Sequence, residues 1–300
     1  MCIDVKMLFT KQYSDDEFQK MGQGNTFDVD HYDTIVDTPN AKGYYIDAVS
    51  GKKKVLFKLL KNKFNEKTQN VATKSFKELA MRKQYNRGMA AGKPKGAKTA
   101  RHMLNGQSMA INFARSNIAG YYDIPDRRHK YAFKTEVACR KTAFTKNNIH
   151  MWEDGVPFIQ KCSALYKTHG GAYYKEQAKE YDIVQNEIKI PNTVFTTVTV
   201  NYNWRTACHK DTGDFSRGLG NLAVTGRDFS GCYLGFPQFK VCIKVEPGDF
   251  LLMDVHQWHC NTEMHLTKPD GFRISYVSYL RNNMSKCSKK RIVDNELYYV

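Results

Sequence analysis

The sequence has little of what marks a secreted or membrane protein. It contains 8 cysteines, but no two of them are spaced as Cys-x-x-Cys. A disulfide or zinc framework is therefore not expected, and reduced thiols in an intracellular protein are the simpler prediction. No apolar run approaches the ~20 residues of a membrane span. The first residues, MCIDVKMLFTKQYSDDEF, also lack the apolar stretch of a signal peptide.

Acidic residues are few relative to basic ones. The 30 Asp and Glu are outnumbered by 46 Lys and Arg, which leaves a net charge of +16. Such an excess favours a polyanionic partner, although charge alone does not separate DNA, RNA and anionic membrane. The basic residues fall in four clusters, which together predict a phosphate-contacting surface: Lys52, Lys53, Lys54, Lys58, Lys61 and Lys63; Lys93, Lys95, Lys98 and Arg101; Arg127, Arg128 and Lys130; Lys286, Lys289, Lys290 and Arg291.

The chain divides by pattern at about residue 130. Residues 1–130 hold short apolar runs and a Gly- and Lys-rich stretch, NRGMAAGKPKGAK, that is typical of a basic loop. We expect this region to be part of the following domain or to pack on it. From 156 to 188 apolar residues recur every three and four positions, with a break at Gly170 and Gly171, which predicts two helices.

After Pro191 the apolar period becomes two. TVFTTVTVNYNW is β-branched and aromatic, which predicts a strand. KVCIKV predicts a half-buried strand, FLLMDV a fully buried strand, and FRISYVSYL the last strand of the series. Short strands separated by turns favour an antiparallel jelly roll. The predicted fold class is α+β, with a double-stranded β-helix core at 131–300 and helices packed on it.

A possible metal site follows the first of these strands. His209 and Asp211 are two residues apart, so in an extended segment their side chains point to the same side. With one further histidine they would form the two-histidine, one-carboxylate set that holds ferrous iron. His256 and His259 both follow the buried strand FLLMDV, and their spacing of three lets only one of them join. Periodicity does not choose between them.

An arginine inside the last strand adds to this set. Arg273 lies fourteen residues after His259. A dioxygenase that uses a 2-oxo acid must hold the distal carboxylate of that acid while its other end chelates the iron. A buried guanidinium can bind a carboxylate through two hydrogen bonds, so we predict this role for Arg273.

Three segments in order resemble a known family. They are similar to the oxygenase domain of the base-J-binding-protein and ten-eleven-translocation (TET) family. The segments are FTTVTVNYNWRTACHKDTGDFSRGLGNLAV, GDFLLMDVHQWHCNTEM and FRISYVSYLR. Members are iron- and 2-oxoglutarate-dependent dioxygenases that act on the 5-methyl group of thymine or 5-methylcytosine in DNA. The similarity covers about residues 190–282 and extends weakly back through NRGMAAG and ARSNIAGYYD.

The resemblance assigns roles to individual residues. It implies Fe(II), 2-oxoglutarate and O2 as cofactor and co-substrates, and it favours His259 over His256 as the third ligand. Its implied site comprises iron ligands His209, Asp211 and His259, co-substrate contacts Arg273, Ser275 and Arg115, and base contacts Asp214, Tyr279 and Arg281. At Asp214 the TET branch carries asparagine, whereas the base-J branch also has aspartate. An aspartate accepts equally from the N3–H of thymine and from a cytosine amino group.

The predicted function is hydroxylation of a pyrimidine 5-methyl group in DNA. A methyl group inside a duplex cannot reach a buried metal, so the base would be flipped out. Two other classes remain open: a jelly-roll dioxygenase acting on RNA, protein or a small molecule, and a non-catalytic nucleic-acid-binding jelly roll. The expected partner is DNA, with no membrane and no obligate protein partner. The expected location is intracellular: the nucleus in a eukaryote, or the host cell for a viral protein.

Overall fold

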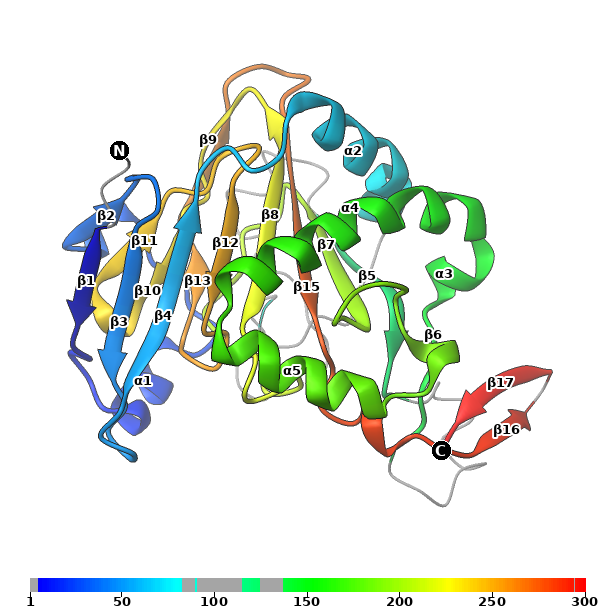
Figure 1. Cartoon of the computed structure of the whole chain (residues 1–300). Coiled ribbons are helices and arrows are strands. Elements are labelled where there is room, and N and C mark those ends of the chain that lie inside the picture. Colours follow the sequence, from blue (N-terminus) through cyan, green and yellow to red (C-terminus); the bar gives the residue numbers. More distant parts are fainter. Residues whose placement is uncertain (1–4, 83–89, 91–114, 125–136, 294) are drawn as a thin grey trace.

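The structure, a computed structural model, describes residues 5–82, 90, 115–124, 137–293 and 295–300. Its main feature is a large sheet flanked on one side by helices and on the other by a smaller sheet (Figure 1). The large sheet has the order β1-β3-β4-β12-β8-β15-β7-β5-β6 and the small sheet the order β13-β10-β11-β2. This confirms the predicted α+β jelly roll with helices packed on it.

The large sheet draws strands from both sides of the predicted boundary at residue 130. Antiparallel pairing joins β4 to β12, so the amino-terminal region continues the sheet that carries the later strands. Its strands are β1 Lys6–Phe9, β3 Lys42–Ile46, β4 Lys53–Leu60, β5 Arg115–Tyr122, β6 Arg140–Lys141, β7 Thr197–Tyr202, β8 Gly220–Arg227, β12 Phe250–Met253 and β15 Phe272–Tyr279.

The small sheet faces the large one across an apolar core. Leu251 and Met253 of β12 pack in this core with Val241 and Ile243 of the small sheet. Phe250, on the other face of β12, packs in the core between the large sheet and the helices. Both faces of β12 are thus buried, as predicted for FLLMDV. The small sheet comprises β2 Thr34–Val36, β10 Leu234–Phe236, β11 Val241–Ile243 and β13 Cys260–Asn261. Two-stranded sheets pair β9 Phe229–Gly231 with β14 Met264–Leu266 and β16 Lys290–Val293 with β17 Glu296–Tyr299.

The prediction of a half-buried strand at KVCIKV is only half right. Val241, Ile243 and Val245 face the core as expected, but Cys242 on the other face is also fully buried. The parallel partner β2, together with Tyr32 just before it, comes from the amino-terminal region and lies beside β11. A pattern within one strand cannot show that a distant segment covers its outer face.

The helical layer covers the opposite face of the large sheet. Phe158, on the buried side of α4, lies 4.9 Å from the ring of Tyr276 in β15, centroid to centroid. The two helices predicted between 156 and 188 are confirmed, with Gly170 ending the first and Gly171 (φ 60°) preceding the second. The layer consists of α2 Glu66–Met81, α3 Ala143–Asn147, α4 Ile149–His169 and α5 Ala172–Ile183, and α1 Asp15–Gly22 lies apart near the small sheet (Figure 1).

Helix α2 was missed in the sequence, although its signal was present. Asn65 caps it by accepting from the backbone N–H of Thr68 at 3.0 Å, and Ala72, Phe76 and Leu79 recur on its buried face. Phe76 packs where α4 has no side chain: a Cβ at Gly155 would lie 2.4 Å from Cζ of Phe76. The two helices therefore approach closely over the sheet.

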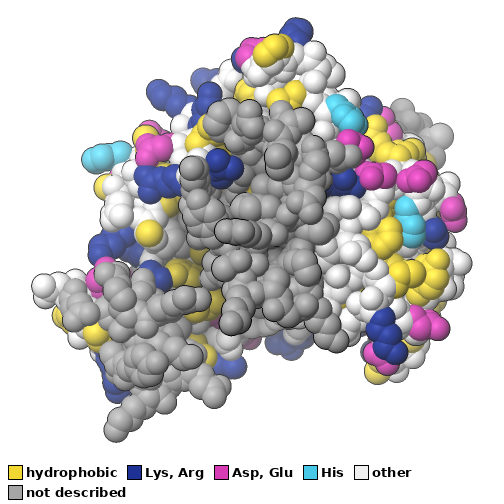
Figure 2. Space-filling view, turned by 180° about the vertical axis from the view of Figure 1, so that it is seen from behind, with side chains coloured by type: hydrophobic (Ala, Val, Ile, Leu, Met, Phe, Trp, Pro, Cys, Tyr) yellow, Lys and Arg dark blue, Asp and Glu magenta, His cyan; other side chains and the backbone are white. Residues whose placement is uncertain are grey.

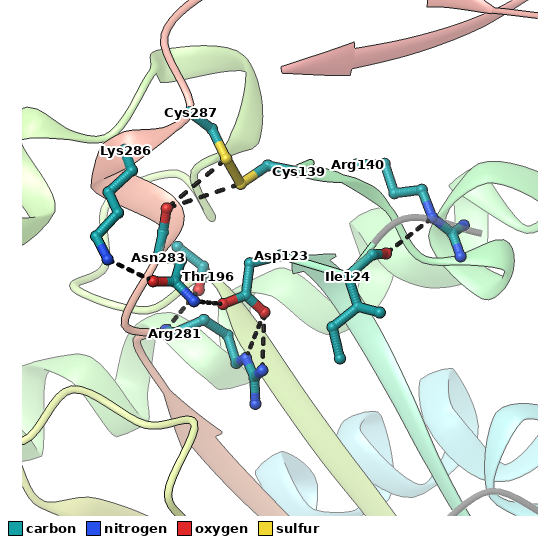
Figure 3. Close-up of a disulfide and its surroundings, with 9 residues drawn as sticks. All are labelled: Asp123, Ile124, Cys139, Arg140, Thr196, Arg281, Asn283, Lys286 and Cys287. Carbon is teal, nitrogen blue, oxygen red and sulfur yellow. Dashed lines mark hydrogen bonds and ion pairs between the residues drawn. A yellow bond between two sulfur atoms is a disulfide. The ribbon is translucent and has the colours of Figure 1, made fainter. Parts of the chain in front are cut away.

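The expectation of reduced thiols is wrong for one pair of cysteines. Cys139 and Cys287, 148 residues apart, form a disulfide (Figure 3). Cys139 also exchanges two backbone hydrogen bonds with Tyr299, so the fold brings the carboxy-terminal hairpin to it. Spacing along the chain does not reveal which cysteines meet in space. Five other cysteines are free and buried in the described structure: Cys162, Cys208, Cys232, Cys242 and Cys260.

The predicted basic surface is described only in part. The clusters at 93–101 and 127–130, and the basic loop at 86–98 apart from Ala90, lie outside the described residues. Where side chains are described on the back of the molecule, Lys and Arg are interspersed with acidic and apolar residues (Figure 2). No helix of the described chain combines the length and apolar character that crossing a bilayer requires.

Lys61 joins three segments at the end of β4. Its Nζ lies 2.8 Å from a carboxylate oxygen of each of Asp37, Glu246 and Asp249, and the Asp249 side chain is only 1% exposed. Burial lowers the pKa of Lys61, but these three acids outweigh it and raise that pKa above its usual value.

We expect Lys61→Met to destabilise the fold by about 3 kcal/mol, because it leaves the buried Asp249 without its cation. Lys54→Met, within β4, is the matched control. Its pair with Asp47 is more exposed, with the lysine side chain 42% accessible, and such a pair contributes about 1 kcal/mol or less. Urea unfolding measures both free energies, and equal effects of the two substitutions would contradict this account of Lys61.

Candidate metal centre and substrate cavity

The centre of the site is a pair of histidines joined through their backbones. His209 follows β7 and His259 follows β12, and the two form an isolated antiparallel bridge. Each donates its backbone N–H to the carbonyl oxygen of the other, at 3.1 Å and 3.0 Å. Residues paired in this way project their side chains on the same side. The imidazole rings accordingly lie 4.4 Å apart, centroid to centroid.

Asp211 completes a three-residue cluster with this pair. Its Oδ1 lies 3.3 Å from Nε2 of His209, and its Oδ2 lies 3.6 Å from Nε2 of His259. The possible ligand atoms of the three residues all lie within 4.8 Å of one another. The backbone N–H of Asp211 donates to the carbonyl of Val255 at 3.0 Å, which ties the ligand turn to the end of β12.

Both imidazoles are oriented by the backbone. Nδ1 of His209 lies 2.9 Å from the carbonyl oxygen of Ala207, and Nδ1 of His259 lies 3.0 Å from that of Gln257. A carbonyl only accepts, so each Nδ1 carries the proton and each Nε2 keeps its lone pair in the neutral ring. Two nitrogens and a carboxylate, aimed at one point, are a suitable donor set for a divalent transition metal.

The electrostatics of the cluster keep its carboxylate charged. Desolvation opposes ionisation of Asp211, but without a metal the protonated imidazoles attract it and donate to it through Nε2, first His209 and then His259, which holds its pKa well below the usual range. Burial lowers the pKa of His259, and the hydrogen bond and charge of Asp211 outweigh this and raise it. The carboxylate is therefore ionised at neutral pH, as a metal ligand must be.

The alternative ligand His256 is turned away from this cluster. Its Nε2 lies 3.3 Å from the carbonyl oxygen of Phe215, and its backbone N–H donates to Asp254. It also does not line the cavity that His209 and His259 share. The geometry thus brings together His259, and not His256, with the predicted pair.

A cavity of about 390 Å³ opens beside the cluster. Its wall combines the three residues with polar groups and with apolar side chains that include Leu222, Leu234, Met253 and Val277. The remaining lining residues are Ala90, Thr199, Asn201, Trp204, Thr206, Lys210, Thr212, Gly213, Asp214, Asn261, Arg273, Ser275, Tyr279 and Arg281. Every site residue predicted from the sequence except Arg115 lines this one cavity.

Arg273 is the most buried charged residue of the cavity. It is only 2% exposed, and its Nε has no hydrogen-bond partner within the described part of the chain. A buried guanidinium N–H without a partner is costly. Ser275, two residues further along the same face of β15, accepts at 3.2 Å from Nδ2 of Asn201. A carboxylate entering the cavity would meet a donor that no described residue engages.

Arg115 is not brought to the cavity with the other residues. Arg115, in β5, pairs with Tyr202 of the neighbouring strand β7, and Tyr202 pairs on its other side with Ile274 of β15. Ile274 points away from Arg273 and Ser275 because successive side chains alternate between faces. Asn117, two residues after Arg115, donates to the backbone carbonyl of Leu79 in α2. The predicted co-substrate contact is therefore not supported, since Arg115 projects from the helix-covered face.

The polar end of the cavity contains the predicted base-contact residues. Asp214 and Arg281 form an isolated antiparallel bridge, and the Tyr279 hydroxyl lies 3.1 Å from that of Thr199. Two supporting residues were missed in the sequence. Asp123 binds the Arg281 side chain, and Gly213 lies against it. A single acid at the end of a strand and a glycine in a turn carry no signal of such roles.

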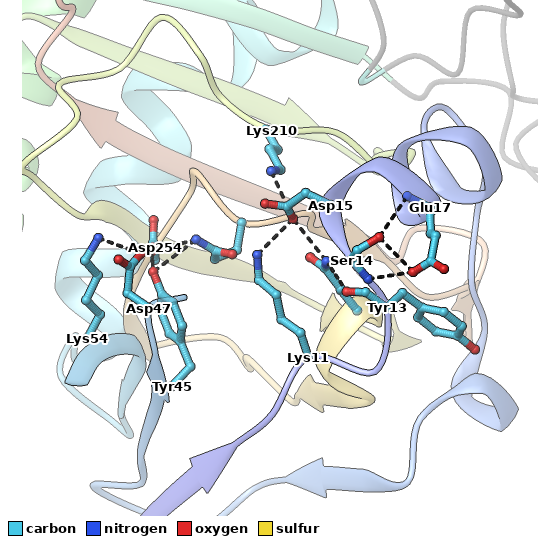
Figure 4. A network of polar contacts seen from close by, with 12 residues as sticks. Lys11, Tyr13, Ser14, Asp15, Glu17, Tyr45, Asp47, Lys54, Lys210 and Asp254 are labelled. Carbon is cyan, nitrogen blue, oxygen red and sulfur yellow. Dashed lines mark hydrogen bonds and ion pairs between the residues drawn. The ribbon is translucent and has the colours of Figure 1, made fainter. Parts of the chain in front are cut away.

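The amino-terminal segment supports the ligand turn from outside. Lys210, between the two ligand residues, extends to Asp15 of α1 with its Nζ 3.4 Å from Oδ1 (Figure 4). Gly24 donates its backbone N–H to the carbonyl of Cys208, and the N–H of Cys208 donates to Asn25. Residues near the start of the chain thus hold the turn that carries His209 and Asp211.

Comparison with known proteins agrees with this geometry. Residues 117–282, more than half of the chain, match the model of the Tet/JBP family, described as the oxygenase domain of the 2OGFeDO superfamily. The chain belongs to this family. The membership predicted from the three motifs is confirmed, and the His-Asp-His cluster lies within the matched range.

Individual members are similar over this region. Thymine dioxygenase JBP1-A from Trypanosoma cruzi is 40% identical over 169 residues, which cover 55% of this chain and 19% of that protein. The bifunctional helicase and thymine dioxygenase JBP2 of the same organism is 36% identical over 180 residues, or 58% and 16% of the two chains. The chain thus spans about a fifth of the length of these relatives.

A solved structure shares the fold. NgTET1, in a complex with 5mC DNA, superposes with a TM-score of 0.54 at 13% identity, covering 84% of this chain and 79% of that one. At this identity the likeness bears on the fold alone.

The three-residue cluster makes a direct prediction for metal binding. Replacing His209, Asp211 or His259 by Ala should weaken the binding of Fe(II), measured anaerobically by calorimetry, by at least about a hundredfold. His256→Ala is the matched control and should bind like the unaltered protein, because its ring is turned toward Phe215. Loss of binding in His256→Ala with retention in His259→Ala would reverse the assignment.

Proposed function

We propose that this chain is an Fe(II)- and 2-oxoglutarate-dependent dioxygenase that hydroxylates the 5-methyl group of a pyrimidine, thymine or 5-methylcytosine, in DNA. One observation carries the proposal: the same cavity is lined by a His-Asp-His cluster and by a buried arginine whose Nε has no partner among the described residues. Family membership supports the oxygenase chemistry, and the relatives named thymine dioxygenases support the substrate.

The metal would be held by Nε2 of His209, Nε2 of His259 and a carboxylate oxygen of Asp211. Three ligands leave further coordination positions for a co-substrate and for oxygen. When bound, iron, 2-oxoglutarate and O2 would supply the oxidising chemistry: one oxygen atom of O2 converts a methyl C–H bond to C–OH, and the other enters succinate as 2-oxoglutarate loses carbon dioxide. The protein contributes the fixed orientation of the two imidazoles, set by the carbonyls of Ala207 and Gln257.

The co-substrate would be anchored at Arg273. Its guanidinium, buried among the strands, would pair with the distal carboxylate of 2-oxoglutarate, and the Ser275 hydroxyl would donate to the same group. The backbone N–H of Arg273 already donates to Oδ1 of Asn203 at 2.7 Å, which fixes the strand end that carries the side chain. An anion at this position would satisfy the Nε that lacks a partner in the described structure.

The target base would occupy the polar end of the cavity. There Tyr279 offers a ring for stacking, Asp214 offers acceptors and Arg281 offers donors. A volume of about 390 Å³ lies within the usual range for small-molecule sites. Because thymine and 5-methylcytosine each present both donors and acceptors, the Asp214–Arg281 pair is compatible with either base.

The charge of the chain suits a DNA substrate. A net charge of +16 favours contact with phosphates, and a base flipped into the cavity leaves its flanking phosphates outside. We include residues 1–130 in the catalytic unit, because β4 continues the central sheet and α1 supports the ligand turn. The corresponding location is the nucleus of a eukaryotic cell, or the host cell if the source is viral.

The substrate proposal is tested by an assay on defined DNA. With Fe(II), 2-oxoglutarate and oxygen, the protein should convert thymine or 5-methylcytosine in duplex DNA to the 5-hydroxymethyl base, detected by nucleoside mass spectrometry. Duplexes that contain only one of the two methylated pyrimidines identify the base. Asp211→Ala should be inactive, because it removes the charged ligand. Absence of oxidised base on both duplexes, from a protein that still consumes 2-oxoglutarate, would disprove the DNA substrate.

The co-substrate proposal has its own variant. Arg273→Met should raise the KM for 2-oxoglutarate at least about tenfold, because it removes the charged donors to the distal carboxylate. Binding of Fe(II) without 2-oxoglutarate should be unchanged in this variant. The control is Arg227→Met at the end of β8, where the arginine side chain is 60% exposed and does not line the cavity. An unaltered KM in Arg273→Met would contradict the assignment.

A further inference from the structure

The side chain of Arg281 is held by a buried acid that does not line the cavity. Oδ1 of Asp123 accepts from Nε of Arg281 at 2.9 Å and lies 2.8 Å from its Nη2 (Figure 3). The Asp123 side chain is 1% exposed, whereas that of Arg281 is 21% exposed and reaches the cavity. A buried carboxylate needs a charged partner, so the two side chains constrain each other.

The second oxygen of Asp123 is also engaged. Oδ2 accepts from Nδ2 of Asn283 at 3.0 Å (Figure 3). The backbone oxygen of Asn283 lies 4.0 Å and 3.7 Å from the sulfur atoms of Cys139 and Cys287, which the disulfide joins. Asp123 is thus fixed within a packed unit behind the cavity, and the carboxylate has little freedom to move away from Arg281.

A glycine bounds the other side of the guanidinium. A Cβ at Gly213 would lie 2.2 Å from Nη1 of Arg281, so the arginine occupies space that only a glycine leaves open. The backbone around Arg281 also contacts this turn. Arg281 forms the antiparallel bridge with Asp214, and the backbone N–H of the following residue, Asn282, donates to the carbonyl of Gly213 at 3.0 Å. The guanidinium therefore lies between Asp123 and Gly213.

We propose that Asp123 is a positioning residue for substrate recognition: it holds the Arg281 guanidinium in one orientation at the cavity, so that its remaining N–H groups face the target base. The inference rests on the proposed function for the identity of the substrate. An arginine has five N–H donors, and Asp123 engages two of the nitrogens. Holding a long side chain in place before binding removes an entropic cost that substrate binding would otherwise bear.

The first test replaces the acid while keeping its shape. Asp123→Asn should raise the KM for DNA about tenfold, because the charge-assisted contact is lost. The kcat at saturating DNA and the KM for 2-oxoglutarate should stay within about twofold, because the metal cluster and Arg273 are untouched. Asp270→Asn is the matched control: Asp270 forms a 2.7 Å pair with Arg227, both side chains are exposed, and neither residue lines the cavity. An unchanged KM for DNA in Asp123→Asn would overturn the inference.

A double substitution separates positioning from general loss of structure. Arg281→Ala should raise the KM for DNA, and Asp123→Asn in that background should raise it no further, because Asp123 acts only through Arg281. A further increase in the double variant would show that Asp123 acts by another route.

Should Asp123→Asn fail to fold, Gly213→Ala provides the test, because the added Cβ displaces the Arg281 side chain and leaves the buried acid in place. Gly213→Ala should then show the same raised KM for DNA, and an unchanged value would overturn the inference.

A measurement without substrate distinguishes failure of this inference from failure of the proposed function. In NMR spectra of ¹⁵N-labelled protein, the Arg281 Nε–H should exchange slowly with solvent, and Asp123→Asn should accelerate its exchange about tenfold or more. Asp270→Asn should leave it unchanged. If this holds while no DNA base is oxidised, the proposed substrate is wrong and the positioning contact stands. Equal exchange in Asp123→Asn and in the unaltered protein would refute the positioning contact.

Discussion

The site depends on the reciprocal backbone hydrogen bonds between His209 and His259. These bonds join the turn after β7 to the segment after β12, two parts of the chain that sequence separates by fifty residues. Because the pair is antiparallel and hydrogen-bonded, both imidazoles project to one side, and Asp211 joins them two residues later. The relative positions of the three ligand side chains are therefore set by strand pairing.

The same pairing anchors the amino-terminal region. Cys208 and Cys260 flank the two histidines and project to the other side, where they are buried with Phe18 and Trp258. One side of this short ladder carries the ligands, and the other side packs against a segment from the start of the chain. Loss of that packing would loosen the ligand pair, so the amino-terminal residues support the site without entering it.

Much of this arrangement could be predicted from local pattern. The continuous apolar run of β12, the strand pattern of β15 and the helical period around Phe158 reflect constraints that act within one element, and the structure contains these elements. The spacing of His209 and Asp211 predicts side chains on one side, and the structure brings both residues into one cluster. Family motifs then favoured His259 over His256. The structure agrees, because the backbone carbonyl of Phe215 engages the ring of His256 away from the cluster.

What could not be predicted depends on contacts between distant segments. The disulfide of Cys139 with Cys287, the burial of Cys242 and the role of Asp123 all arise from neighbours far away in sequence. Arg115 shows how register limits a motif-based assignment. A motif suggested that it meets the co-substrate, but the register of β5 against β7 places it on the helix-covered face. A one-residue difference in register decides which face a side chain occupies.

Anomalous diffraction at the iron edge, from crystals grown anaerobically with Fe(II) and 2-oxoglutarate, tests the central claim most directly. The account predicts one strong peak about 2.1 Å from Nε2 of both His209 and His259 and from a carboxylate oxygen of Asp211. Density for 2-oxoglutarate should extend from this peak to the guanidinium of Arg273. A peak bound by His256, or iron at the cluster with the co-substrate carboxylate away from Arg273, would contradict it.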